Sequence, residues 1–208
     1  ERPEAVEIVQ THLSVVCLTG DVAYKLKKSI RLPFADFTSI ERRQAYCEEE
    51  CRLNRRLCPD IYLSVETLRL RPDGGLTFCP DAGGEIVDHA VKMRRLPADR
   101  MLDVLLAAGR VGEDAIRRIA RRMAAFHDGA DRSARVSEWG SPEKLAAFAL
   151  ANFDEARSAI GTVFPAPLFA ALEARTRADF ARCLPTLLRR AASGRVVDGH
   201  GDLHARNI

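Results

Sequence analysis

Residues 197–208 of this chain read VDGHGDLHARNI, and within them residues 200–207 form the pattern HGDLHxxN. Asp202 and Asn207 stand five residues apart on what reads as a single loop. Such a pair can divide the work of phosphoryl transfer, because the carboxylate orients the acceptor hydroxyl while the amide oxygen holds a magnesium ion on the phosphates. The pattern therefore predicts a phosphotransferase catalytic loop, with Asp202 and Asn207 as catalytic residues and Asn207 as a metal ligand.

On this loop the chain resembles the aminoglycoside phosphotransferase family of the protein-kinase-like fold, whose loop is shared by fructosamine, choline and homoserine kinases. Three further strings are similar to bacterial bifunctional aminoglycoside phosphotransferase and ATP-binding proteins: THLSVVCLTGDVAYKLKK at 11–28, CEEECRLNRRLCPDIYL at 47–63 and VKMRRLPADRML at 91–102. The resemblance covers nearly the whole chain. It implies ATP and Mg²⁺ as cofactors, a small-molecule hydroxyl as acceptor of the γ-phosphate, and a fused C-terminal ATP-binding domain as a possible partner.

The same resemblance implies an α+β fold with two lobes. Residues 1–93 would form the nucleotide-binding lobe and residues 94–97 a hinge that meets the adenine, with Met93 beside it in the nucleotide site. Residues 98–208 would form a mainly helical lobe that ends in the catalytic loop. In the family a second metal-binding aspartate and the acceptor helices follow this loop, so we expect an incomplete lobe and weak or no activity from these 208 residues alone.

Composition is that of an ordinary globular protein, with 47% hydrophobic residues and a net charge of +3. The charge is too small to indicate a nucleic-acid partner. The sequence has no apolar run of about 18 residues and no signal-peptide pattern at its N-terminus. We therefore expect a cytoplasmic protein with no membrane contact.

Six cysteines show no spacing typical of a disulfide framework. Reduced thiols are expected. Cys47, Cys51 and Cys58 would share one helical face and could bind zinc, but their spacing matches no common zinc finger. Apolar packing is the preferred interpretation.

The first lobe reads as an antiparallel sheet with one helix. Residues 6–28 alternate as strands around a Gly20-Asp21 turn, residues 61–78 form a hairpin around the turn at 71–75, and residues 85–93 add a further strand. We predict five strands. Between the first two strands lies a loop at 10–14 without glycine, where Thr11 and Ser14 could donate to phosphate oxygens or simply form a strand connection.

A helix is predicted from Ser39 to Leu57, opened by a capping box at residues 38–41 and closed before a proline. With about 100° between successive residues, Glu50 falls on the inner, apolar side of this helix. A carboxylate aimed at the interior needs a cationic partner, and Lys25 on the third predicted strand is the candidate. The family resemblance independently selects Lys25 and Glu50 as the pair that positions nucleotide phosphates.

The second lobe reads as four helices followed by the catalytic loop. Their predicted ranges are 98–108, 113–128, 141–159 and 167–192. Pro185 should kink the last helix, since proline removes a backbone hydrogen bond. Gly194 should end it and lead into the loop.

Two other functions are compatible with the sequence. A nucleotide-binding regulatory module, or pseudokinase, would keep the nucleotide site without transfer. A metal-dependent hydrolase would use His200, Asp202 and His204, which on an extended strand would project three ligands from one face. In the kinase interpretation His200 belongs to the catalytic loop, where the family uses this histidine mainly as a structural element.

Overall fold

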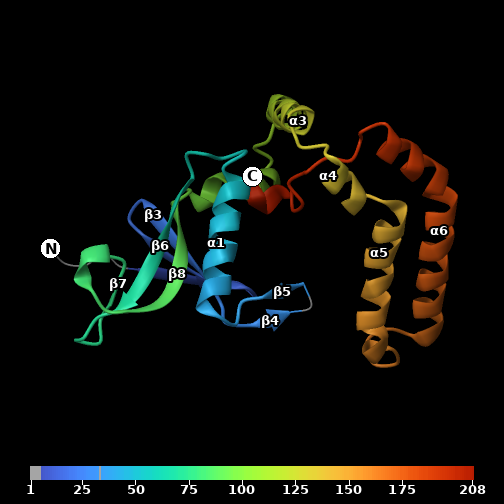
Figure 1. Ribbon diagram of the computed structural model, residues 1–208. Coiled ribbons are helices and arrows are strands. Elements are labelled where there is room, and N and C mark those ends of the chain that lie inside the picture. The colour runs from blue at the N-terminus through green and yellow to red at the C-terminus, as the bar shows by residue number, and fades with distance from the viewer. Residues whose placement is uncertain (1–5, 33) are drawn as a thin grey trace. The chain divides into compact units, whose positions relative to one another are not determined.

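The computed structural model describes residues 6–32 and 34–208, and it is an α+β fold (Figure 1). The chain folds into two compact units. One, the sheet unit, extends to Gly112 and takes in His200–Ile208; the other, the helical unit, is Glu113–Gly199. The loop predicted to be catalytic therefore groups with the first half of the chain, whereas the predicted lobes divide at residues 94–97.

The sheet unit is built on an antiparallel sheet with the strand order β1-β2-β3-β8-β6-β7. These strands are β1 (Glu7–Gln10), β2 (Ser14–Thr19), β3 (Val22–Lys27), β6 (Tyr62–Leu70), β7 (Leu76–Thr77) and β8 (Glu85–Arg94). The sheet has six strands, so the prediction of five is wrong. The turn at 71–75 closes through a 2.8 Å bond from Arg71 N to Gly75 O, which returns β7 onto β6 as a short strand of its own.

A second, two-stranded sheet pairs β4 (Arg31–Leu32) with β5 (Ala35–Asp36). It is followed by helix α1 (Ile40–Asn54), which packs against β8 and β6. Directly opposed residues of antiparallel strands share a face, so Val16, Lys25 and Val91 lie on one face of the sheet. That face carries α1 (Figure 1).

Between α1 and the sheet lies a small core of Cys47, Cys51 and Val91. Burial raises the pKa of the Cys47 thiol to about 11, so it stays protonated and packs as an apolar group. Cys58 is exposed because it follows the end of the helix, and the expectation that it shares the buried face is wrong. The described residues contain no group of three or more His, Cys, Asp and Glu side chains placed to hold a metal ion.

The ends of α1 differ from the prediction. Ser39 is the N-cap, since its hydroxyl accepts from Arg42 N at 3.3 Å, whereas the predicted capping residue Thr38 donates to Asp36 Oδ1 at 2.6 Å. The helix ends at Asn54 rather than Leu57. Both Leu57 N and Cys58 N bond to Asn54 O, which tightens the chain into a turn before Pro59.

The region predicted as a helix at 98–108 consists of a 3₁₀ turn, η2 (Ala98–Arg100), and a short helix, α2 (Leu102–Ala107). Both belong to the sheet unit. The C-terminal 3₁₀ turn η4 (Ala205–Asn207) contacts α2, and Leu102 N donates to Ile208 O at 2.8 Å. The C-terminal segment is thus attached to the sheet unit through α2.

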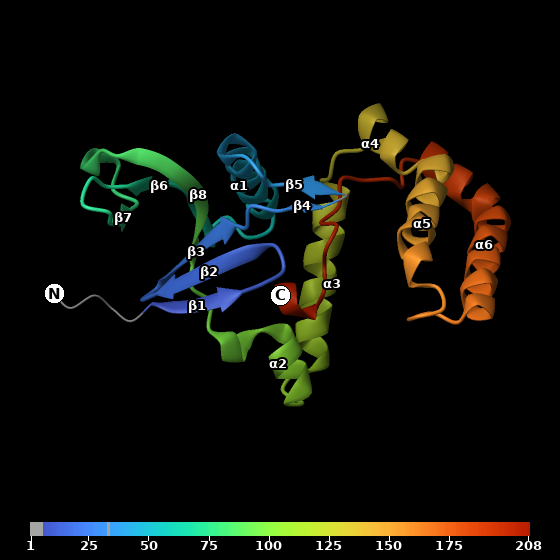
Figure 2. The same cartoon turned by 90° about the horizontal axis from the view of Figure 1, so that it is seen from below.

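The helical unit contains α3 (Glu113–Asp128), α4 (Ala134–Trp139), α5 (Pro142–Ala156) and α6 (Ala166–Ala192). Helix α4 is not among the predicted helices, and α5 ends in a 3₁₀ turn, η3 (Arg157–Ala159). Helices α5 and α6 pack side by side (Figures 1 and 2), with the Phe153 and Phe169 rings nearly at right angles and 5.5 Å between their centroids.

The ribbon of α6 bends in its C-terminal part (Figure 1), in the half of the helix that contains Pro185. Gly194 follows the helix with a φ of +66°. Arg195 N bonds to Arg190 O, and Gly194 N bonds to Ala191 O, which is the Schellman pattern of helix termination. The prediction that Gly194 ends this helix is confirmed. No helix in the described part of the chain is long and apolar enough to cross a bilayer.

Candidate functional site

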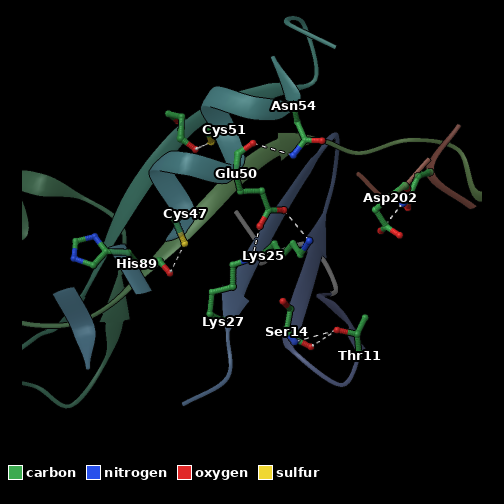
Figure 3. A network of polar contacts seen from close by, with 12 residues as sticks. Thr11, Ser14, Lys25, Lys27, Cys47, Glu50, Cys51, Asn54, His89 and Asp202 are labelled. Carbon is green, nitrogen blue, oxygen red and sulfur yellow. Dashed lines mark hydrogen bonds and ion pairs between the residues drawn. The ribbon is translucent and has the colours of Figure 1, made fainter. Parts of the chain in front are cut away.

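The site is centred on Glu50 of α1, whose carboxylate accepts from two lysines of β3 (Figure 3). Lys25 Nζ lies 2.7 Å from Oε1, and Lys27 Nζ contacts Oε2. Lys25 and Lys27 are two residues apart, so the strand presents both on the same face. The ion pair between Lys25 and Glu50 that the sequence predicts is present, and Lys27 is an additional partner.

Glu50 is largely buried, with 13% of its side chain exposed. Burial by itself raises the pKa of this carboxyl, but Coulomb attraction and hydrogen bonds from Lys25 and Lys27 outweigh burial and leave the pKa lowered. The carboxylate is therefore ionised at neutral pH. Asn54 lies one helical turn after Glu50, and its Nδ2 donates to the backbone oxygen of Glu50 at 2.9 Å.

The loop between β1 and β2 is closed by its own polar groups (Figure 3). Thr11 Oγ1 accepts from Ser14 N at 3.0 Å and donates to Ser14 O, and Thr11 N also bonds to Ser14 O. The Thr11 hydroxyl is thus engaged within the loop, and the Ser14 side chain is buried. The amides of His12 and Leu13 have no hydrogen-bond partner among the described residues, which makes them the donors that this loop can offer.

The predicted hinge lies beside a cavity of about 410 Å³. Its lining consists of Glu7, Leu18, Gly20, Asp21 and residues 95–98. Leu18 is two residues beyond Val16, the partner of Lys25, so this lining residue lies on the face of the sheet that carries Lys25. This volume is within the range of about 300–1,000 Å³ typical of small-molecule sites.

Backbone groups of the predicted hinge at 94–97 are partly engaged. Arg94 N donates to Ile61 O at 2.9 Å and Arg95 N donates to Asp21 O at 2.7 Å. Met93, predicted to belong to the nucleotide site, is partly buried and packs against the core of Cys47, Cys51 and Val91. Its side chain therefore borders the core just before the hinge.

Asp202 and Asn207 lie on one loop and are hydrogen-bonded to each other. Asn207 Nδ2 donates to Asp202 O at 2.8 Å and to Asp202 Oδ2 at 3.0 Å. With Nδ2 turned inward, the amide Oδ1 of Asn207 has no donor among the described residues. The Asp202 side chain is 78% exposed. The pair thus presents a carboxylate and an amide oxygen from one turn of chain, in the same compact unit as Lys25 and Glu50.

Two histidines of this loop accept hydrogen bonds from backbone amides through their Nδ1 atoms. His200 accepts from Asp202 N at 3.3 Å, and His204 accepts from Arg206 N at 3.2 Å. Asp202 Oδ1 is 3.7 Å from His204 Nε2. The segment from His200 to His204 is irregular rather than an extended strand, so the arrangement on which the hydrolase alternative depends is not formed.

Two charged residues near the site are not predicted from the sequence. The strand period could have placed Lys27 on the same face as Lys25, because the two residues are two positions apart on β3. Arg43 could not have been found in this way, because it lies on the predicted helix among polar neighbours. In the structure it is buried, with Nε 2.7 Å from Asp88 Oδ1 and NH1 2.9 Å from Phe37 O.

Comparison with known proteins gives relatives without an assigned function. The chain is 30% identical over 203 residues to uncharacterized proteins of Mycobacterium tuberculosis, Rv2004c and MT2060, and of Mycobacterium bovis, Mb2027c. The matched region is 98% of this chain and 39% of each relative, so the chain spans about two fifths of their length. No family model and no solved structure matches the chain.

Proposed function

We propose that this chain carries the nucleotide site and catalytic loop of a phosphotransferase related to the aminoglycoside phosphotransferases. It would transfer the γ-phosphate of ATP to a hydroxyl of a small molecule. The observation that carries the proposal is the ion pair between Lys25 and Glu50, at 2.7 Å, in the same compact unit as the Asp202 and Asn207 pair. These residues lie in three separate parts of the sequence, and kinase-like enzymes need all of them.

Each residue has a chemical task in this proposal. Lys25, oriented by Glu50, would bind the phosphates of ATP. The free amides of His12 and Leu13 would donate to phosphate oxygens, because backbone N–H groups in a short turn form an anion-binding concavity. The cavity beside residues 95–98 would receive the base.

The donor atoms of the catalytic loop suit magnesium, which prefers carboxylate and amide oxygens supplemented by substrate phosphates. Asn207 Oδ1 would hold the ion, and the exposed Asp202 carboxylate would orient the acceptor hydroxyl and accept its proton. A bound magnesium ion would neutralise charge on the phosphates. His200 would keep the loop in shape through its bond with Asp202 N.

The test is calorimetric titration of Mg-ATP into the 208-residue chain and its variants. Lys25→Ala should weaken binding about tenfold or more, because it removes a charge-assisted hydrogen bond. Asn207→Ala should weaken binding only when magnesium is present. Lys92→Ala is the matched control, since Lys92 is also a strand lysine but pairs with Glu66 on the opposite face of the sheet.

Binding alone does not separate an enzyme from a regulatory module. Transfer of radiolabelled phosphate from ATP to a panel of polyhydroxylated and aminated small molecules should be measured with the wild type and Asp202→Ala. Transfer that is abolished by Asp202→Ala with unchanged Mg-ATP affinity supports the enzyme. Transfer that persists in Asp202→Ala refutes the catalytic role of Asp202, and a folded chain that does not bind Mg-ATP refutes the proposal.

A further inference from the structure

Glu50 is bonded to two lysines. Lys25 binds Oε1 and Lys27 binds Oε2, so each carboxylate oxygen has its own ammonium partner (Figure 3). Two ammonium groups against one carboxylate leave one unit of positive charge in the cluster. A largely buried cluster with excess positive charge is a place where an anion is stabilised.

The two lysines differ in access to solvent. The side chain of Lys25 is 29% exposed, and that of Lys27 is 11% exposed. Lys27 is further confined by Phe37, a buried ring whose centroid lies 5.8 Å from Nζ. An anionic ligand arriving from solvent can therefore reach the ammonium group of Lys25, while Lys27 stays bound to Glu50.

Lys27 also lies next to the loop at 10–14. It is directly opposite Ser14 in the pairing of β2 with β3, and the following amide, Lys28 N, bonds to Leu13 O at 2.8 Å. The loop, Lys27 and Glu50 are therefore connected through a continuous set of backbone and side-chain contacts. A change at Lys27 would be felt at the carboxylate and at the loop end of the strand.

We propose that Lys27 is a positioning residue of the phosphate site. It retains Glu50 through Oε2, so that Lys25 can turn from Glu50 to a phosphate without leaving the buried carboxylate uncompensated. This inference rests on the proposed function, and it assigns to a second lysine a task that the Lys25 and Glu50 pair alone does not perform.

The physical reason is competition for a single ammonium group. With Lys25 as the sole partner, each interaction gained with phosphate would be lost from a buried carboxylate, and unpaired buried charge is strongly unfavourable. With Lys27 in place, Glu50 keeps one charge-assisted hydrogen bond throughout. Lys25 can then give its donors to the phosphate without removing the last partner of the buried carboxylate.

The experiment measures the affinity of Mg-ATP and of sodium tripolyphosphate for the wild type, Lys27→Met and Lys27→Arg by calorimetry. Lys27→Met should weaken both ligands about tenfold, the value of one charge-assisted hydrogen bond. Lys27→Arg should restore affinity to within about threefold, because the guanidinium keeps the charge. Lys92→Met is the control, and Lys27→Gln replaces Lys27→Met if that variant does not fold.

A second readout reports on Glu50 itself. The carbon NMR signal of the Glu50 side-chain carboxyl should titrate at higher pH in Lys27→Met than in the wild type, because burial is then opposed by Lys25 alone. Affinity for tripolyphosphate should correspondingly begin to fall at higher pH as the solution is acidified. The other titratable neighbours of Glu50, namely Tyr62, Cys47 and Cys51, have a raised pKa from burial and stay neutral in this range.

The outcomes separate this inference from the function on which it rests. If the wild type binds Mg-ATP but Lys27→Met binds equally well, or its Glu50 titration is unchanged, the role of Lys27 is refuted and the proposed function stands. If Lys27→Arg does not rescue binding, charge is not what Lys27 supplies, and the role is refuted again. If the folded wild type binds neither ligand, both proposals fail together.

Discussion

The sheet unit and the helical unit differ in how they bury side chains. In the sheet unit the buried apolar residues are Ala23, Ala35, Phe37, Cys47, Cys51, Ala90 and Val91, with Ser14, Arg43 and His89 as buried polar residues. In the helical unit the buried residues are Phe169 and Pro142. Large apolar side chains such as Trp139, Phe148 and Leu188 are exposed there.

The difference in burial indicates that the sheet unit is the more rigid of the two units. The charged residues of the candidate site need fixed positions, and they lie on or beside the densely packed sheet and α1. The helices of the second unit depend on local pairs, such as Phe153 with Phe169. Segments with few buried apolar contacts open at lower free energy, so we expect hydrogen exchange to be faster in α5 and α6 than in β3 and β8.

Among single substitutions, Phe169→Ala should destabilise the protein most. This ring is 5% exposed and contacts Phe153 and Phe164. Its removal should destabilise the helical unit by about 4 kcal/mol, the usual cost of truncating a buried phenylalanine. Denaturant unfolding, together with hydrogen exchange resolved for α5 and α6, measures it.

The matched control for Phe169 is Phe148→Ala, because Phe148 is 54% exposed and stacks on a second exposed ring, Trp139. Its cost should stay below about 1 kcal/mol. Equal costs for the two substitutions, or equal exchange in both units of the wild type, would contradict the contrast in burial.

Next in size is Arg43→Met in the sheet unit. Arg43 is 6% exposed, and its removal takes the cationic partner from Asp88, which keeps a bond from His89 N, and the donor from the carbonyl of Phe37. Breaking such a buried ion pair should cost about 3 kcal/mol. Urea unfolding followed by far-ultraviolet circular dichroism would measure the loss, with hydrogen exchange assigning it to β8 and α1.

Arg42→Met provides the control for Arg43, since Arg42 is the preceding residue on α1 and pairs with Asp36 at the surface. Exposed ion pairs contribute about 0–1 kcal/mol. A cost for Arg43→Met no greater than that for Arg42→Met would show that the buried pair does not hold the sheet unit together.

The helix caps should contribute least. Ser39 accepts from Arg42 N and Ser141 accepts from Lys144 N, both at 3.3 Å, so each unit has a serine cap with the same donor–acceptor distance. Substitution of either by alanine should cost about 1 kcal/mol. Exchange should increase in α1 for Ser39→Ala and in α5 for Ser141→Ala. A change in exchange that spreads to the other unit would mean that the two units unfold together.

Much of the local structure followed from the sequence. The strand period predicted β3 and β8, the helical period placed Glu50 on the inner face of α1, and Gly194 marked the end of α6 as expected. The positions of buried charges were harder to predict. Both Lys27 and Arg43 have polar sequence neighbours, and what makes them distinctive is burial against Glu50, Phe37 and Asp88, which are distant in sequence.

Two features could be derived from the order of the residues alone: the alternation of apolar side chains and the pairing of Lys25 with Glu50. The first follows from periodicity, and the second from the need of an inward carboxylate for a cation. Three others arise only when the chain is packed, namely that residues 200–208 group with the sheet unit, that Thr11 is engaged within its loop, and that Lys27 shares Glu50. These depend on which backbone groups and charges find a partner from a distant part of the chain, and such partners are set by the whole fold.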